Sequence, residues 1–423
     1  MVILSRSALR GRLLLACVLV TALAIALLAA TADRTINPMQ RFFGLWRARH
    51  ALGGGGLLVV AVALGAAALS RRAFLAFLTA GLGVAVTIGA LVLVGMARVV
   101  TWSDLFTSRQ AGLGRRVAPH LDVSGTTFQD TASIWGMASD PIPFRYRTDR
   151  YGFRNEADRA GADVYLLGDS MLVAALIPFD RTVVARLEGA LRRPVMQIAL
   201  IGIGPQEEQD LFRKAGLEAR GRLVIQFVYE ANDLLDSMRV RRPPPRGATA
   251  LWNRTLTYQL VRNLQNLTRP AISGARSQVC TIEGQTYTFL WIRDSFAGVE
   301  GEATAISDAL SGFATEIRQA GGEFAVVFIP SKLRVLGPLC RFPPGSDLSE
   351  YTSHLSPLRE HLRAWSGRSG VDLLDLTEPL LAAARAGRVP WLWGDTHWNE
   401  EGHAVAAGAI SVWAPLAKRR QAP

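Results

Sequence analysis

Five short apolar runs alternate with segments of helical spacing from Ala162 onward, and this alternation constrains the fold more than any other feature. Such runs, bounded by turn residues, are typical of strands buried on both faces, as in a parallel sheet. The runs are Val164–Leu167, Val195–Ile201, Leu223–Tyr229, Phe324–Ile329 and Val371–Leu374. The alternation predicts an α/β fold, a three-layer sandwich with a mostly parallel central sheet.

The first run ends in Gly168-Asp169-Ser170, ahead of a segment with helical spacing from Met171 to Leu191. A strand, a glycine turn and a helix start place Ser170 at the carboxyl end of the sheet, where open α/β sheets bind ligands. A serine there is a nucleophile if a base reaches it, and the helix dipole and free N–H groups would stabilise an oxyanion. Taken alone, however, these common turn residues favour Ser170 as a plain helix cap.

Two further strand ends carry candidate oxyanion donors. Gly202, in a glycine-rich turn after the second run, would let a backbone N–H approach a substrate oxygen closely. Asn232 follows the third run and can direct its side-chain amide at the same oxygen. Each also has a simpler interpretation, as an ordinary strand-ending turn and as a helix cap.

The stretch from Gly394 to His403 supplies a candidate base. His397 is the expected general base, and Asp395, two residues earlier, is expected to hold the imidazole tautomer. His403 is expected to be structural. A metal site made of Asp395, His397 and His403 lacks a recognised ligand spacing, so we expect neither a metal nor a cofactor.

Read together, the four stretches resemble the SGNH (GDSL-like) hydrolase superfamily, whose sequence blocks are named for Ser, Gly, Asn and His. The resemblance covers roughly residues 145–412. It implies a flavodoxin-like sandwich with Ser170 as nucleophile, Gly202 and Asn232 in the oxyanion hole, and Asp395 and His397 completing the triad.

The spacing Asp395-Thr-His397-Trp is shorter than the common Asp-x-x-His of the superfamily. It resembles the branch of periplasmic alginate O-acetylation proteins and related exopolysaccharide acetyltransferases. Two positions depart from the family pattern: Gln197 stands where Asn is usual, and Ala231 where Gly or another small residue precedes the block-three asparagine. Neither departure removes a catalytic group.

The first 100 residues predict a membrane anchor with about three transmembrane helices, at Leu13–Ala30, Ala51–Leu69 and Ala73–Ala97. A cleaved signal peptide is the alternative for the first. The arginines of Arg6–Arg12 and the Arg71-Arg72 pair predict cytoplasmic flanks. We therefore expect a bacterial inner-membrane protein whose catalytic domain is periplasmic.

The remaining chain divides into a connecting arm (101–160), the catalytic domain (161–416) with an insert around 240–280, and a basic tail (417–423). Trp252 and Tyr258 of the insert would stack on a glycan if exposed, although buried aromatics are commoner. Cys280 and Cys340 are equally compatible with a disulfide in an oxidising compartment and with two free thiols. Lys332 is expected in solvent.

The formal charge of +12 does not indicate a nucleic-acid partner, because the arginines are scattered and only three of the 47 basic residues are lysines. The resemblance and the spans favour O-acetylation of a cell-surface or secreted polysaccharide through an acyl-serine. Expected partners are the glycan acceptor, membrane lipid, and a membrane-bound O-acyltransferase that supplies acyl groups. The alternatives are an esterase or deacetylase of envelope glycans or lipids, and a non-catalytic scaffold in a polysaccharide assembly complex.

Overall fold

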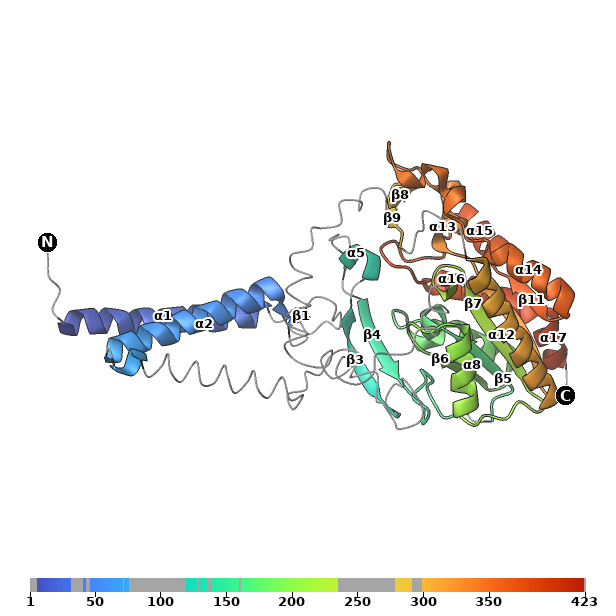
Figure 1. Cartoon of the computed structure of the whole chain (residues 1–423), viewed down its shortest axis with the longest axis horizontal. Coiled ribbons are helices and arrows are strands. Elements are labelled where there is room, and N and C mark those ends of the chain that lie inside the picture. Colours follow the sequence, from blue (N-terminus) through green and yellow to red (C-terminus); the bar gives the residue numbers. More distant parts are fainter. Residues whose placement is uncertain are drawn as a thin grey trace. The chain divides into compact units, whose positions relative to one another are not determined.

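The chain falls into two compact units, an N-terminal one that contains α1, β1, β2 and α2, and a larger one that contains the remaining elements (Figure 1). The computed structural model describes residues 6–31, 41–42, 46–70, 72–75, 119–127, 129–134, 139–140, 142–159, 161–234, 278–290 and 299–421.

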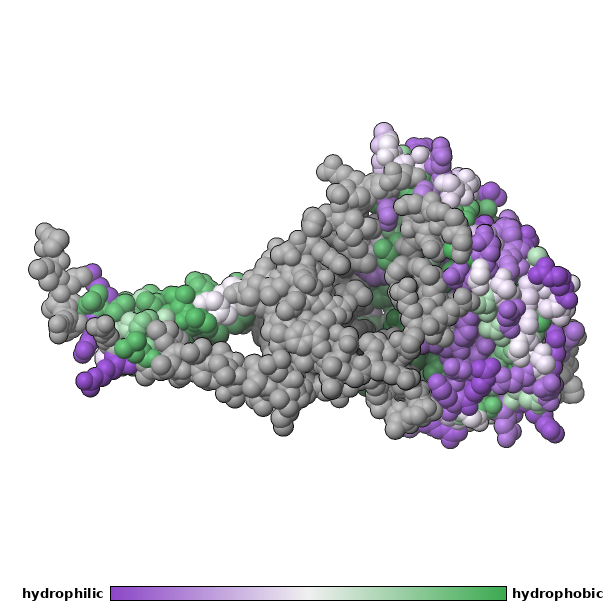
Figure 2. Space-filling view, in the orientation of Figure 1, coloured by the Kyte–Doolittle hydropathy of each residue, from purple (hydrophilic) through white to green (hydrophobic). Residues whose placement is uncertain are grey.

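The N-terminal unit is built from two apolar helices, α1 (Arg6–Thr31) and α2 (Ala48–Leu69), which pack against each other. The short strands β1 (Arg41–Phe42) and β2 (Trp46–Arg47) pair between them. Within α1, Leu9–Ala30 is long and apolar enough to cross a membrane, a property that a signal sequence shares. The visible surfaces of both helices are largely hydrophobic (Figure 2).

Only the first of the three expected spans therefore meets the length and composition of a membrane helix. The apolar part of α2, Gly53–Leu69, is shorter. The third expected span lies almost entirely outside the described residues.

The larger unit is organised around a five-stranded parallel sheet. Its strands are β5 (Val164–Gly168), β6 (Val195–Ala199), β7 (Leu223–Tyr229), β10 (Glu323–Ile329) and β11 (Asp372–Asp375), in the spatial order β11-β10-β7-β5-β6. In chain order this is 2-1-3-4-5, the flavodoxin-like arrangement, and ligands bind such sheets where the order reverses, between β5 and β7. The predicted parallel α/β fold and all five predicted strands are confirmed.

Helices cover both faces of this sheet, since every residue of β5, β6 and β7 is buried. On one face, α8 (Pro205–Lys214) contacts α12 (Glu300–Gln319), and α12 contacts α14 (Leu358–Ser369) (Figure 1). A chain of edge-to-face ring contacts joins the sheet to these helices. It runs from Tyr165 in β5 to Phe212 in α8, then to Phe313 in α12 and back to Phe324 in β10. A second group, α7 (Val183–Leu191), α15 (Thr377–Arg385) and α16 (Glu400–Val412), packs together beside β6.

The single helix expected from Met171 to Leu191 is broken. A one-turn helix, α6 (Ser170–Val173), ends at Ala174, whose φ is 51°. The buried Arg154 guanidinium donates to the carbonyls of Val173, Ala174 and Ile177, so these acceptors are satisfied without a continuing helix. Because α6 is one turn long, the helix dipole acting at Ser170 is smaller than the sequence suggested.

The chain ends in α16, which is capped by the Asn399 side chain, followed by α17 (Ala414–Gln421). Most of the expected basic tail is thus helical. Arg419 of α17 donates to the Gly221 carbonyl and to Glu323, at the amino end of the sheet.

Two antiparallel strand pairs lie outside the parallel sheet, one before β5 in the sequence and one between β7 and β10. In the expected connecting arm, β3 (Asp122–Thr127) and β4 (Ile142–Arg147) pair antiparallel, with α5 (Asp130–Ile134) between them in sequence. Further on, β8 (Val279–Ile282) and β9 (Gln285–Thr288) form a hairpin. Cys280 and Cys340 form a disulfide, which settles the choice that the sequence left open. Trp252 and Tyr258 lie outside the described residues.

Candidate active site

The candidate nucleophile lies at the edge of the sheet where the strand order reverses. We call residues 168–170, after β5, and 229–233, after β7, the nucleophile edge. Asp169, not Ser170, is the N-cap of α6: its Oδ1 accepts from the Met171 N–H (2.9 Å). Its Oδ2 accepts from Asn232 Nδ2 (3.2 Å), which ties the two strand ends together.

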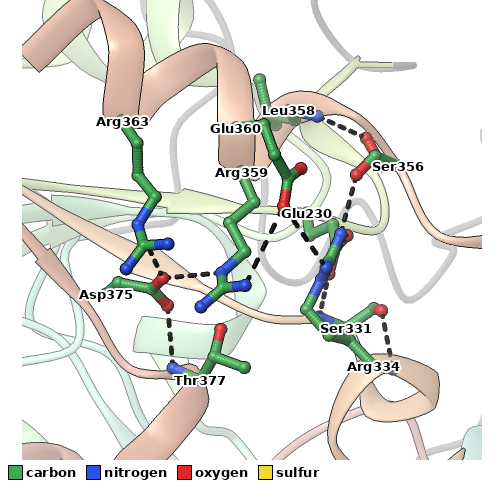
Figure 3. Close-up of polar contacts among 10 residues, drawn as sticks. All are labelled: Glu230, Ser331, Arg334, Ser356, Leu358, Arg359, Glu360, Arg363, Asp375 and Thr377. Atoms are coloured by element: carbon green, nitrogen blue, oxygen red, sulfur yellow. Dashed lines mark hydrogen bonds and ion pairs between the residues drawn. The ribbon is translucent and has the colours of Figure 1, made fainter.

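The end of β7 is held by a buried ion pair (Figure 3). Both Glu230 oxygens accept from the forked guanidinium of Arg334, in α13 (Lys332–Leu336), and one also accepts from the Ser331 N–H. The side chains of Glu230 and Arg334 are 1% and 9% exposed. A paired charge at this depth has one low-energy geometry, so it fixes the backbone two residues before Asn232.

Gly202 lies in the turn three residues beyond β6, the strand that borders β5. Its φ of +71° is in the left-handed region, which a glycine adopts without strain. The turn is therefore at the same edge of the sheet as Ser170, as the sequence predicted.

The candidate base and its partner lie in a loop of irregular structure, residues 391–398, which we call the base loop. Asp395 Oδ1 accepts from the His397 backbone N–H (3.0 Å) and is 2.5 Å from His397 Nδ1. Asp395 is 1% exposed, whereas 23% of the His397 side chain is exposed. The acid is thus buried behind an imidazole whose outer part reaches solvent.

Lys332 supports the base loop, contrary to the expectation that it is solvated. Its ammonium is buried and donates to the carbonyls of Leu392, Trp393 and Asp395, at 2.8, 2.9 and 3.0 Å. An ammonium has three donors, and all three are used. Burial lowers the pKa of Lys332 to about 7, against the opposing charges of Asp395 and Asp130.

A second support comes from α5, which sequence reasoning missed. The Asp130 N–H donates to Asp395 Oδ2 (2.7 Å), and the Asp130 carboxylate accepts from the N–H and hydroxyl of Thr396. Gln129 Oε1 accepts from the Gly394 N–H (2.7 Å), and the Gly394 carbonyl accepts from Ala132. Nothing in the sequence pairs two segments 265 residues apart.

These contacts define the protonation of the pair. Burial opposes charge on His397, but the charge and hydrogen bond of Asp395, with Asp130 and Asp169, raise its pKa to about 9. Burial likewise opposes charge on Asp395, but His397 and the backbone donors hold the pKa of that carboxyl below its usual value. Burial and the Asp395 charge raise the pKa of Asp130 to about 6. His397 therefore has a strong tendency to take up a proton.

Two other expectations concern the final block. His403 is structural, as predicted: it is buried in α16, its Nδ1 accepts from the Val183 N–H, and burial lowers its pKa to about 3. Ligand atoms of Asp130, Asp395 and His397 lie within 4.8 Å of one another. Both oxygens of Asp395, both oxygens of Asp130 and His397 Nδ1 take part in the hydrogen bonds above, which is the arrangement of an oriented base.

A hollow lies beside the end of β7 and Thr396, and Ser170, Asn232 and His397 are not part of its lining. Its lining comes from the end of β7, from Phe289 and Leu290 just after β9, from the start of α13, and from Thr396 of the base loop. Its wall is partly apolar, from Phe289 and Leu333, and partly polar, from Ser331 and His354.

The structure brings Ser170, Asn232, Asp395 and His397 to one edge of the sheet. The charge of Asp169, beside Ser170, acts on His397, and Asp169 itself binds Asn232. Within the described part of the chain, Ser170 and His397 are not hydrogen-bonded to each other. Such contacts are often long before substrate binds.

No family model matches the chain, and no curated protein matches it. Three solved structures of low similarity are a lipolytic protein of the G-D-S-L family from Desulfitobacterium hafniense, the acetyl xylan esterase AlAXEase, and the acetyl xylan esterase Est2A from Butyrivibrio proteoclasticus. Their identities are 11%, 10% and 10%, with TM-scores of 0.32, 0.31 and 0.29. They cover 59%, 58% and 64% of this chain, and 97%, 96% and 67% of their own.

Proposed function

We propose that this protein is a serine-dependent acyl-transfer enzyme of the SGNH kind that O-acetylates a cell-surface or secreted polysaccharide. The observation that carries the proposal is the Asp395–His397 pair, buried on its acid side and open on its imidazole side, at the same sheet edge as Ser170. A buried carboxylate that orients a histidine is the arrangement that activates a serine hydroxyl.

In the first half-reaction, Ser170 Oγ attacks the acetyl carbonyl of the donor while His397 takes the hydroxyl proton. The oxyanion that forms is bound by the N–H groups of Ser170 and Gly202 and by the Asn232 amide. Its collapse breaks the bond to the leaving group, which takes the proton from His397, and acetyl-Ser170 remains. Asp395 stays ionised and stabilises the imidazolium.

In the second half-reaction, His397 takes the proton of a sugar hydroxyl, whose oxygen attacks acetyl-Ser170. The collapse of this second intermediate releases the acetylated sugar and returns the proton to Ser170. The acyl donor would come from a membrane-bound O-acyltransferase.

The placement outside the cytoplasm is supported by two independent features. The apolar stretch Leu9–Ala30 suits a membrane anchor. The Cys280–Cys340 disulfide suits an oxidising compartment such as the periplasm.

The test uses the full-length protein in detergent with p-nitrophenyl acetate as donor, with and without an oligosaccharide acceptor. Mass spectrometry follows the acetyl group. Acetyl transfer to the sugar that is lost in Ser170→Ala and kept in Ser349→Ala, an exposed serine, supports the proposal. Release of free acetate alone, whatever sugar is offered, would make the protein an esterase, and turnover unaffected by Ser170→Ala would exclude this mechanism.

A further inference from the structure

We propose that Asp130, from the segment that precedes the central sheet, is a positioning residue that holds the Asp395–His397 pair in its productive geometry and places a second carboxylate beside it. The inference rests on the proposed function, because it assigns a role within the same site. It extends the site to a part of the chain that lies before the nucleophile in sequence.

The first argument is the number of contacts that join the two segments. Residues 129–132 and 394–396 share five hydrogen bonds, two of which use the Asp130 carboxylate and one its backbone N–H. The segments also touch: a Cβ on Gly394 would lie 2.7 Å from the Ala132 Cβ, so only glycine fits there. This closeness leaves the base loop no room to move toward α5.

The second argument concerns the acid of the pair. Asp395 Oδ1 is used by His397, and Asp130 supplies the N–H that engages Oδ2. With both oxygens held, the carboxylate plane is fixed, and so is the direction in which the imidazole points. A carboxylate held by one oxygen alone would rotate about its Cβ–Cγ bond.

The third argument is charge. Asp130 is partly buried and its carboxylate acts on His397, where it adds to the effect of Asp395. The acids that act on His397 are Asp395, Asp130 and Asp169. The neighbouring ionisable groups are Lys332, Tyr229 and His403, on which Glu230, Asp233, Arg154 and Arg186 act in turn. Asp130 is the acid among these that Thr396 holds through two hydrogen bonds. A neutral side chain at this position would make the imidazolium less stable.

The test compares Asp130→Asn with Glu323→Gln, a control that removes the charge of an exposed acid at the amino end of the sheet, opposite the site. The readout is the pH at which the His397 imidazole titrates, followed by NMR in the full-length protein, with His397→Gln to assign its signal. Asp130→Asn is expected to lower that pH by about one unit, and Glu323→Gln to leave it unchanged. The acid limb of the kcat/KM profile should move to lower pH by the same amount, with KM unchanged.

An unchanged titration of His397 in Asp130→Asn, or an equal shift in Glu323→Gln, overturns the inference. This readout does not depend on turnover, so it is distinct from failure of the proposed function, which Ser170→Ala reveals. If Asp130→Asn does not fold, Asp130→Ser, which is smaller and keeps the backbone N–H to Asp395, carries the same expectation.

Discussion

The nucleophile edge and the base loop meet at one site but are held in place in different ways. The nucleophile edge continues from two buried strands, β5 and β7, paired in register, so their ends are adjacent by construction. The base loop has little regular structure and is held by side chains from elsewhere, mainly Lys332 and Asp130. The candidate nucleophile is therefore placed by the fold, and the candidate base by long-range contacts that single substitutions can break.

Among substitutions in the base loop, Asp395→Asn is expected to lower kcat the most. Without the carboxylate, the imidazole loses both its orienting acceptor and the charge that stabilises its protonated form. We expect kcat to fall on the order of 10⁴-fold with the fold intact. Asp375→Asn is the control, since Asp375 is also an ion-paired acid but is half-buried and faces Arg359. A loss below tenfold would contradict the role given to Asp395.

The pH dependence of the reaction tests the charge around His397. The neutral imidazole is the base, and its fraction falls tenfold for each pH unit below the pKa of about 9. The value of kcat/KM should therefore rise with pH and level off near pH 9, a change of about 100-fold from pH 7. A profile that is flat over this interval would mean that His397 is not the base.

Removing the support from α13 should have a smaller effect. Lys332→Met keeps the length of the side chain but leaves three buried carbonyls without their donor. We expect unfolding free energy to fall by about 2–4 kcal/mol and kcat by about tenfold. Urea unfolding and steady-state kinetics measure both, with the exposed Lys214→Met as the control. An unchanged kcat would show that the base loop keeps its shape without Lys332.

The nucleophile edge should tolerate change better. Arg334→Lys keeps the charge beside Glu230 but loses the forked geometry, so we expect a stability loss of about 1 kcal/mol and a two- to fivefold fall in kcat. Arg359→Lys makes the same change at the Asp375 pair (Figure 3) and should cost stability without slowing the reaction. If the two variants had the same kcat, the Glu230–Arg334 pair would not be what holds Asn232 in place.

The same contrast explains what could be predicted from the sequence. The strands and the residues that follow them are local patterns, and Ser170, Gly202 and Asn232 lie where those patterns placed them. The helix after Ser170 was predicted too long because Arg154, outside the segment, satisfies its carbonyls. Asp130 gave no local signal. Lys332 did give one, as one of three lysines in the chain and directly after a strand, but its burial depends on carbonyls 60 residues away.

The central claim is that Ser170 carries the acyl group, and the most direct measurement is its acetylation. The full-length protein is mixed with p-nitrophenyl acetate, quenched in acid within the first turnovers, digested, and mapped by mass spectrometry. We predict one acetyl group on the peptide that contains Ser170, none in Ser170→Ala, and much slower labelling in Asp395→Asn. Turnover that continues with no acetyl on Ser170, or with the acetyl on another residue, would contradict the account.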